Sequence, residues 1–188
     1  MKTAIFGGTF DPIHSAHLVV AREAADAFRL DRVLFVPAAH PPLKDSSASF
    51  EDRFRMVELA CAADPRFVAS RLEEGSERSY SIYTIEKVVA ENGRVFFIIG
   101  ADAFADIEKW HRAGDVIRAV EFIVVARPGH SFTSPENARV HRLDTVALPV
   151  SSSEIRQQLA RGETPAALPP EVASYIRQRG LYAARSHA

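Results

Sequence analysis

The chain opens with MKTAIFGGTFDPIHSAHLVV (residues 1–20), and this stretch decides the fold class. Residues 3–6 form an apolar run typical of a β-strand, and a helical pattern occupies residues 18–28. Between them lie glycines, a proline and histidines (7–17). A strand that enters a helix through a glycine-containing turn is the beginning of a βαβ unit. We therefore expect a parallel sheet, with this turn at the carboxyl end of its first strand.

Short β-rich runs and helical patterns alternate through the rest of the chain. Residues 95–99 form an unbroken apolar run, the pattern of a strand buried on both faces of a sheet. Right-handed βαβ connections then predict an α/β fold, a Rossmann-like, doubly wound, mainly parallel sheet with helices on both faces. The other expected strands are 33–36, 67–69, 121–126 and 145–150, and the other expected helices are 50–61, 81–90, 116–120, 155–159 and 171–179.

Length and composition limit the class of protein. The chain has 188 residues, 47% of them hydrophobic, which predicts one domain over 1–188 with its own core. Lys+Arg 23 against Asp+Glu 24 gives a formal net charge of -1 at pH 7. This balance argues against bulk binding to nucleic acid or to a membrane, although a local basic site for a small anion remains open. The single cysteine, Cys61, excludes an internal disulfide and a cysteine-rich zinc site, and its apolar surroundings predict a buried thiol.

The sequence also bears on where the protein acts. The apolar run at the start of MKTAIFGGTF is too short for a signal peptide. No run approaches the roughly 18 apolar residues of a membrane span. We expect a soluble cytoplasmic protein, either a monomer or a homodimer.

The turn after the first strand has the composition of a phosphate site. In a doubly wound sheet, ligands bind beyond the carboxyl ends of the strands. Gly7 and Gly8 let a ligand approach the main chain and can adopt positive φ. The N–H groups of Gly8, Thr9 and Phe10 can face a phosphate. The turn differs from both common phosphate loops, because it lacks GxGxxG and does not end in Lys-Ser/Thr.

The histidines of this turn point to chemistry. His14 and His17 are three residues apart at a helix start, so both imidazoles lie on the side that faces an anion. As donors they could stabilise charge that builds up on a phosphoryl group, without a covalent step. The alternative is structural, with His14 a turn residue and His17 a helix cap. The Gly-Gly-Thr-Phe-Asp-Pro before them favours the catalytic interpretation.

A second segment, VSSSEIR (150–156), points to the same kind of ligand. Ser151 and Glu154 have the spacing of a capping box, and an ordinary helix cap is the plain interpretation. The same helix start also offers free N–H groups, the hydroxyls of Ser151 and Ser152, and the Arg156 guanidinium to one anion. Together with the histidine turn, it would complete a clamp for a polyphosphate.

These two stretches carry a resemblance to a known family. Residues 7–17 resemble the G-G-x-F-D-P-x-H-x-G-H signature of the nucleotidyltransferase superfamily, with Ala16 in place of the usual glycine. Residues 150–156 resemble its I-S-S-T-x-I-R motif, with Val150 and Ser153 as departures. Within the superfamily, the chain resembles the bacterial nicotinate-nucleotide adenylyltransferases over nearly its whole length. The further matching stretches are PPLK (41–44), SYSIYT (79–84), IIGAD (98–102), Trp110 and PPEVASYIRQRGLY (169–182).

The resemblance implies adenylyl transfer from ATP to nicotinate mononucleotide, with nicotinate adenine dinucleotide and pyrophosphate as products in NAD biosynthesis. A phosphate monoester is already an anionic nucleophile near neutral pH, so no general base is required. His14 and His17 would act at the α- and β-phosphates, and Ser151, Ser152 and Arg156 would hold the departing β- and γ-phosphates. Mg²⁺ would be carried by the phosphates rather than by protein side chains.

Several single residues are assigned to the nucleotides. Asp102 follows a buried strand and would accept the hydroxyls of a ribose, unless it only caps a helix from Ala103. Lys44 is expected to contact a phosphate, since Leu43 stands where the family often has a histidine. Arg127 is either a phosphate ligand or a solvated loop charge.

The acceptor half would be built from SYSIYT and the tryptophan. Ser81 and Thr84 offer hydroxyls near a helix start, whose N–H groups could bind the nicotinate carboxylate. Ser81 stands where the family usually has threonine. Trp110 would stack on the pyridine ring, with plain surface packing as the alternative. Asp11 is expected to shape the turn before Pro12 rather than to do chemistry.

Other functions stay open at this point. A sibling transferase for nicotinamide mononucleotide or phosphopantetheine would share both phosphate motifs and differ only in the acceptor half. A non-catalytic nucleotide-binding module on the same sheet would have no need of His17 or Arg156, yet both are present. A dinucleotide-dependent oxidoreductase is disfavoured, because GxGxxG is absent from the first turn.

Overall fold

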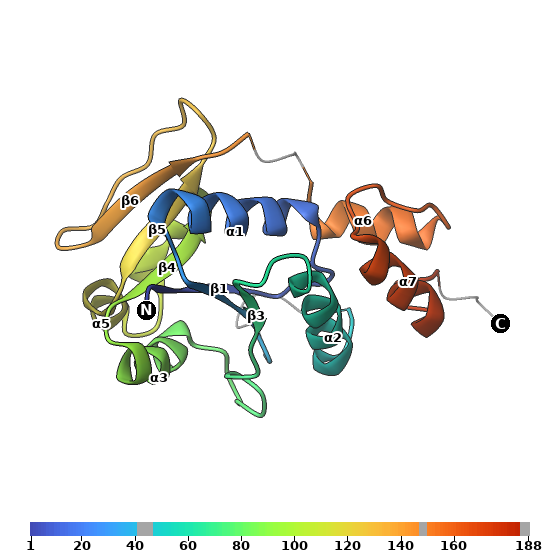
Figure 1. The fold of residues 1–188 in the computed structure, drawn as a ribbon, viewed down its shortest axis with the longest axis horizontal. Coiled ribbons are helices and arrows are strands. Elements are labelled where there is room, and N and C mark those ends of the chain that lie inside the picture. The colour runs from blue at the N-terminus through green and yellow to red at the C-terminus, as the bar shows by residue number, and fades with distance from the viewer. Residues whose placement is uncertain (41–46, 147–149, 185–188) are drawn as a thin grey trace.

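The computed structural model describes residues 1–40, 47–146 and 150–184, and it confirms the doubly wound α/β fold. The sheet has the strand order β3-β2-β1-β4-β5-β6, and every neighbouring pair is parallel (Figure 1). The strands are β1 (Thr3–Gly8), β2 (Arg32–Pro37), β3 (Phe67–Ala69), β4 (Val95–Gly100), β5 (Glu121–Ala126) and β6 (Arg139–Asp144). The helices are α1 (Ser15–Phe28), α2 (Phe50–Cys61), α3 (Ser81–Asn92), α4 (Ala101–Ala105), the 3-10 turn η1 (Ile107–Lys109), α5 (Ala113–Ala119), α6 (Ser152–Ala160) and α7 (Pro170–Arg179).

The strand order reverses at β1. The chain steps from β1 through β2 to β3 on one side and then returns to place β4 on the other side of β1. At such a switch point the connections leave in opposite directions, which opens a crevice outside the carboxyl ends of the strands. The ends that border it are Gly7 and Gly8 of β1 and Gly100 of β4.

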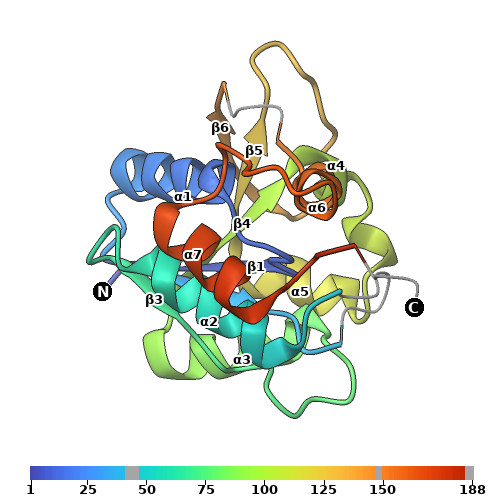
Figure 2. The same ribbon diagram turned by 90° about the vertical axis from the view of Figure 1, so that its right-hand side faces the viewer.

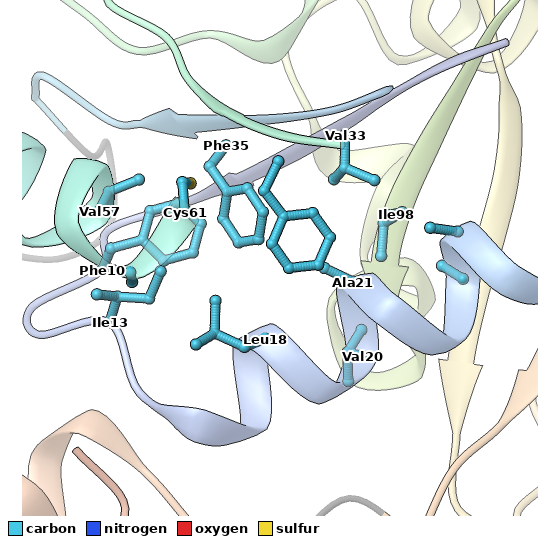
Figure 3. Packing of buried hydrophobic residues seen from close by; sticks show 14 of the residues in the cluster. Phe10, Ile13, Leu18, Val20, Ala21, Val33, Phe35, Val57, Cys61 and Ile98 are labelled. Atoms are coloured by element: carbon cyan, nitrogen blue, oxygen red, sulfur yellow. The ribbon is translucent and has the colours of Figure 1, made fainter. Parts of the chain in front are cut away.

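Helices cover both faces of the sheet because side chains alternate along each strand. In β2, Val33 and Phe35 belong to the core shared with α1, α2 and α7, whereas Leu34 and Val36 belong to the core shared with α3, α4 and α5. Figure 3 shows the first core, where loop, helix and strand side chains meet. Within the described residues, no helix is long and apolar enough to cross a membrane.

The last strand is not where the sequence placed it. The pattern at 145–150 predicted a strand, but β6 is Arg139–Asp144, residues 147–149 lie outside the described residues, and Val146 is exposed. The error has a physical reason. β6 pairs only with β5 among the described strands, and most of its side chains are exposed or half-buried, so it lacks the apolar run of a central strand.

Other boundaries move by a few residues, and one of these shifts matters for the site. Helix α1 begins at Ser15 rather than at residue 18, so His17 lies in its first turn and His14 is its N-cap residue.

Cys61 is buried as expected, and burial raises the pKa of its thiol to about 12, which keeps it an unreactive packing residue.

Candidate functional site

His14 and His17 lie face to face at the start of α1. Their ring centroids are 3.8 Å apart at an interplanar angle of 26°, and Phe6 and Phe10 pack edge-on against the His17 ring. The main-chain N–H of His14 donates to Nδ1 of His17 over 3.2 Å. Because Nδ1 accepts this bond, a neutral His17 carries its proton on Nε2, where it is a donor.

Both imidazoles are neutral near pH 7. Burial lowers the pKa of His14 to about 4. Burial also lowers the pKa of His17 well below its ordinary value, and the neighbouring His14 lowers it further. The His14 side chain is almost fully buried, and its Nδ1 has no hydrogen-bond partner within the described parts of the chain. A buried ring nitrogen without a partner is the kind of group that a ligand satisfies.

Side chains that are distant in the sequence donate hydrogen bonds to the main chain of the loop between β1 and α1. Arg53 of α2, which is fully buried, donates from Nη1 to the carbonyl of Thr9 over 2.8 Å. The Ser152 hydroxyl donates to the carbonyl of Pro12 over 2.9 Å. In a planar trans peptide the C=O and the following N–H point in opposite directions, so these bonds turn the N–H groups of Phe10 and Ile13 away from Arg53 and Ser152.

The glycines that start this loop differ in what surrounds them. At Gly7 an added Cβ would meet nothing within 4 Å, and the residue is exposed, which leaves open space for a ligand beside the main chain. At Gly8 an added Cβ would lie 3.1 Å from the Phe10 ring. Neither glycine has positive φ. The left-handed residue of the loop is Phe10, with φ of 50°, and its side chain is buried in the core.

The serine segment lies against the same loop, as the sequence predicts. Ser151 is the N-cap of α6, and its hydroxyl accepts the N–H of Glu154 over 3.2 Å. Arg156, half-buried, donates from Nη1 to the carbonyl of Asp11 over 2.7 Å. Figure 2 shows α6 and α7 at the end of the molecule that faces the viewer, with β1 behind them. Residues 140 positions apart thus form one wall, and the planar fork of Arg156 has further donors for an anion.

A cavity of about 350 Å³ opens at the carboxyl ends of β4 and β5. Asp102 lies on its rim as the second residue of α4, exposed; Gly100, not Asp102, is the N-cap of that helix. Arg127 and Thr145 also line the cavity. His130 is a further lining residue that the sequence did not single out, because it lies in a loop without a motif.

Part of SYSIYT (79–84), which is expected to bind the acceptor, forms the start of α3. Ser81 is the first residue of that helix, and Tyr80, its N-cap, gives no side-chain cap hydrogen bond. Tyr80 stacks on His111, the residue that follows Trp110, with ring centroids 4.3 Å apart. The indole of Trp110 is partly buried and packs edge-on against Phe97.

Thr84 is occupied by a partner that the sequence did not reveal. Its side chain is buried, and its hydroxyl donates to Oε1 of Glu73 over 2.9 Å. The hydroxyl proton of Thr84 is therefore bonded to Glu73 and is not available to a ligand. The donors that remain are the first N–H groups of α3 and the hydroxyl of Ser81.

One predicted site residue lies outside the described part of the chain. Lys44, with the rest of PPLK (41–44), lies outside the described residues. Among residues 1–40, 47–146 and 150–184, no group of three His, Cys, Asp or Glu side chains is spaced to hold a metal ion. Arg53 was missed in the sequence because its charge sits within an ordinary amphipathic helix.

Known proteins match this chain over most of its length. The family model described as cytidylyltransferase-like matches residues 5–158. The chain is 58% identical over 187 residues to a probable nicotinate-nucleotide adenylyltransferase of Solibacter usitatus (strain Ellin6076), covering 97% of this chain and 100% of that protein. The chain belongs to the nicotinate-nucleotide adenylyltransferase family. A second family member, from Geobacillus kaustophilus (strain HTA426), is 42% identical, with 98% of this chain and 88% of that protein covered.

Solved structures of nicotinate-nucleotide adenylyltransferases share the fold. The chain resembles Plasmodium falciparum nicotinic acid mononucleotide adenylyltransferase complexed with NaAD, with a TM-score of 0.80 at 21% identity, covering 97% of this chain and 98% of that one. The same enzyme complexed with APC gives a TM-score of 0.78 at 21% identity, with 96% of each chain covered. The sequence-based assignment of fold and family is thereby confirmed, and this family consists of nucleotidyltransferases.

Proposed function

We propose that this chain transfers the adenylyl group of ATP to nicotinate mononucleotide. The observation that carries the proposal is the stacked pair of neutral imidazoles, His14 and His17, at the loop that follows β1. They lie at the switch point of the sheet, against the serine and arginine wall of α6. Family membership supports the same activity, since the relatives named above are nicotinate-nucleotide adenylyltransferases.

The reaction needs positioned anions rather than a protein nucleophile. A phosphate oxygen of nicotinate mononucleotide attacks the α-phosphorus of ATP, and the bond from that phosphorus to the bridging oxygen of the β-phosphate breaks. Pyrophosphate leaves with the electron pair, and nicotinate adenine dinucleotide is the second product. The monoester is largely a dianion near pH 7, so the attacking oxygen needs no base. Catalysis then rests on alignment and on donors aimed at the charge that develops.

The donors are supplied by the β1–α1 loop and by α6. The Nε2–H of His17 and a ring nitrogen of His14 would face the α- and β-phosphates, together with the loop N–H groups of Gly8, Thr9 and Phe10. Neutral imidazoles donate without the cost of burying a charge before the substrate arrives. Ser151, Ser152 and Arg156 would hold the β- and γ-phosphates, and Lys44, which lies outside the described residues, would add a positive charge.

The two nucleosides would bind at the two ends of the row of phosphates held by these donors. The cavity of about 350 Å³ suits the adenosine, with the exposed Asp102 carboxylate accepting the ribose hydroxyls. The uncapped start of α3, with Ser81, suits the carboxylate of nicotinate, and Trp110 would lie against the pyridine ring. Mg²⁺ would enter with ATP and neutralise phosphate charge. Phosphate oxygens would be its main ligands, because Mg²⁺ usually binds substrate phosphates and keeps several waters.

A pyrophosphate-release assay tests the proposal. ATP and Mg²⁺ are supplied with nicotinate mononucleotide, nicotinamide mononucleotide or phosphopantetheine in turn, and release without any acceptor is the control. We expect the fastest release with nicotinate mononucleotide. Preference for another acceptor would move the chain to a sibling activity, and no release with any acceptor would indicate a nucleotide-binding module.

The remaining expectations stay predictions. They include a single domain over 1–188, which rests on length, and the absence of nucleic-acid or membrane partners, which rests on the net charge of -1. A cytoplasmic location and a monomeric or homodimeric state are the others.

A further inference from the structure

The C-terminal segment reaches back to the loop that carries the histidines. Tyr182, after α7, donates its hydroxyl to Oδ1 of Asp11 over 2.6 Å, across 171 positions in the chain. The Asp11 carboxylate is buried at 3% exposure. It also accepts the N–H groups of Ser47 and Ala48, over 2.6 Å and 3.1 Å. One buried carboxylate therefore joins the β1–α1 loop, the segment before α2 and the end of the chain.

The backbone of Tyr182 has an unfavourable conformation. Its φ is 60°, in the left-handed region that residues other than glycine rarely adopt. Burial raises the pKa of the Tyr182 hydroxyl, and its bond to Asp11 raises it further. The phenol is therefore protonated near neutral pH, where it donates to Asp11.

Asp11 lies in the middle of the β1–α1 loop. Its own carbonyl accepts from Arg156. The carbonyl of Thr9, two residues before it, accepts from Arg53, and that of Pro12, the next residue, accepts from Ser152. These bonds fix the main chain at those carbonyls, whereas Tyr182 fixes the side chain of Asp11. Only Pro12 and Ile13 separate Asp11 from His14 in the chain, so we expect a displacement of Asp11 to change the positions of the imidazoles.

We propose that Tyr182 is a positioning residue for adenylyl transfer, which acts through Asp11 to place the loop that carries His14 and His17. This proposal rests on the proposed function for its kinetic consequence. Tyr182 itself need not touch either substrate. Its hydroxyl contributes the one side-chain hydrogen bond that ties this loop to the C-terminal segment among the described residues.

The first experiment compares two variants that each lose one hydroxyl. Tyr182→Phe removes the donor to Asp11. Tyr175→Phe is the matched control, because Tyr175 donates to Oδ1 of Asp52 over 2.8 Å, also a buried carboxylate but on α2 rather than on the loop. Tyr182→Phe loses a hydrogen bond to a charged group that positions the loop. We therefore expect its kcat to be about tenfold lower than that of the parent, and its KM values to change less than about threefold. Tyr175→Phe should keep the kcat of the parent.

The second experiment reads the loop directly and needs no reaction. The imidazole signals of His14 and His17 are followed by NMR in the free protein and assigned with single histidine variants. We expect both signals to shift in Tyr182→Phe and to stay in place in Tyr175→Phe. Thermal unfolding of both variants reports their losses of stability, which should be similar.

The outcomes separate the two proposals. Unchanged imidazole signals in Tyr182→Phe would overturn the positioning role, and so would an equal loss of kcat in Tyr175→Phe, which would indicate general destabilisation. If the parent released no pyrophosphate with any acceptor, the proposed function would fail, whereas the imidazole signals would still decide whether Tyr182 places the loop.

Discussion

His17 uses its two ring nitrogens for different tasks. Nδ1 accepts the N–H of His14 and so completes the start of α1, while the proton on Nε2 is available to a substrate. The capping and the catalytic interpretations of this residue are therefore compatible. They can also be separated, because asparagine reproduces an acceptor near Nδ1 but has no donor near Nε2.

We expect His17→Asn to fold like the parent and to lose kcat. Loss of a donor at the developing charge typically costs roughly 10²–10³-fold in kcat, and the KM for ATP should change little. His17→Gln, whose amide reaches toward the Nε2 position, should retain more activity than His17→Asn. Steady-state kinetics and thermal unfolding measure both effects. A raised KM with unchanged kcat would instead give His17 a role in ground-state ATP binding.

His14 predicts how stability depends on pH. The folded state holds its pKa at about 4, against 6.5 in the unfolded chain. Between these values the unfolded state binds more protons, so the free energy of unfolding falls as the pH is lowered from 6.5 toward 4. The full difference corresponds to about 3 kcal/mol for this group.

The test is the free energy of unfolding in urea at pH 7 and at pH 4.5. His14→Gln removes the titrating group, so it should lose less stability than the parent between these two pH values. Equal losses in the parent and in His14→Gln would show that His14 is not the group responsible.

At the scale of elements, the β1–α1 loop shows how adjacent glycines serve different purposes. The Phe10 ring covers Gly8, whereas open space faces Gly7. We predict that Gly8→Ala lowers the melting temperature, because the added Cβ would lie 3.1 Å from the Phe10 ring and the ring must shift within the packed core. Gly7→Ala should keep the melting temperature of the parent but raise the KM for ATP, because its methyl group occupies space beside the phosphates. Calorimetry and kinetics on the pair check this, and a stable Gly8→Ala protein with parental kinetics would contradict it.

The start of α3 predicts the choice of acceptor. With the Thr84 hydroxyl given to Glu73, the free groups there are N–H donors and Ser81, which suit a carboxylate and oppose the NH₂ of an amide. An opposed buried donor costs ~1–3 kcal/mol, or about one to three powers of ten in kcat/KM. We therefore expect kcat/KM for nicotinate mononucleotide to exceed that for the amide more than tenfold, and Ser81→Ala to reduce the ratio. Equal use of both acceptors would remove this pocket from the proposal.

At the scale of the whole molecule, the site is assembled from distant parts of the chain. The loop after β1 carries the histidines, α2 supplies Arg53, α6 supplies Ser152 and Arg156, and the segment after α7 supplies Tyr182. The site is therefore complete only when the first and last elements have docked. In the strand order around β1, this assembly lies at the point where a doubly wound sheet opens a crevice.

Much of this organisation could be predicted from the sequence. The apolar run of β4 and the alternation of elements determine a parallel sheet, because buried strands and amphipathic helices have different periodicities. Residues 7–17 and 150–156 could be recognised as candidate phosphate sites because glycines, histidines and a serine cap lie close together in the sequence. The edge strand β6 was missed, since a strand with few buried side chains has no such pattern.

By itself, then, the sequence determined the fold class and the family, and it predicted where phosphate would bind; all three depend on neighbours along the chain. Only the tertiary structure decided which side chains support the site. The buried Arg53 behind Thr9, the Glu73 that takes the Thr84 hydroxyl and the Tyr182 that holds Asp11 are all such cases. The physical reason is that a buried hydrogen bond between remote residues depends on where whole elements dock, and local periodicity carries no record of that.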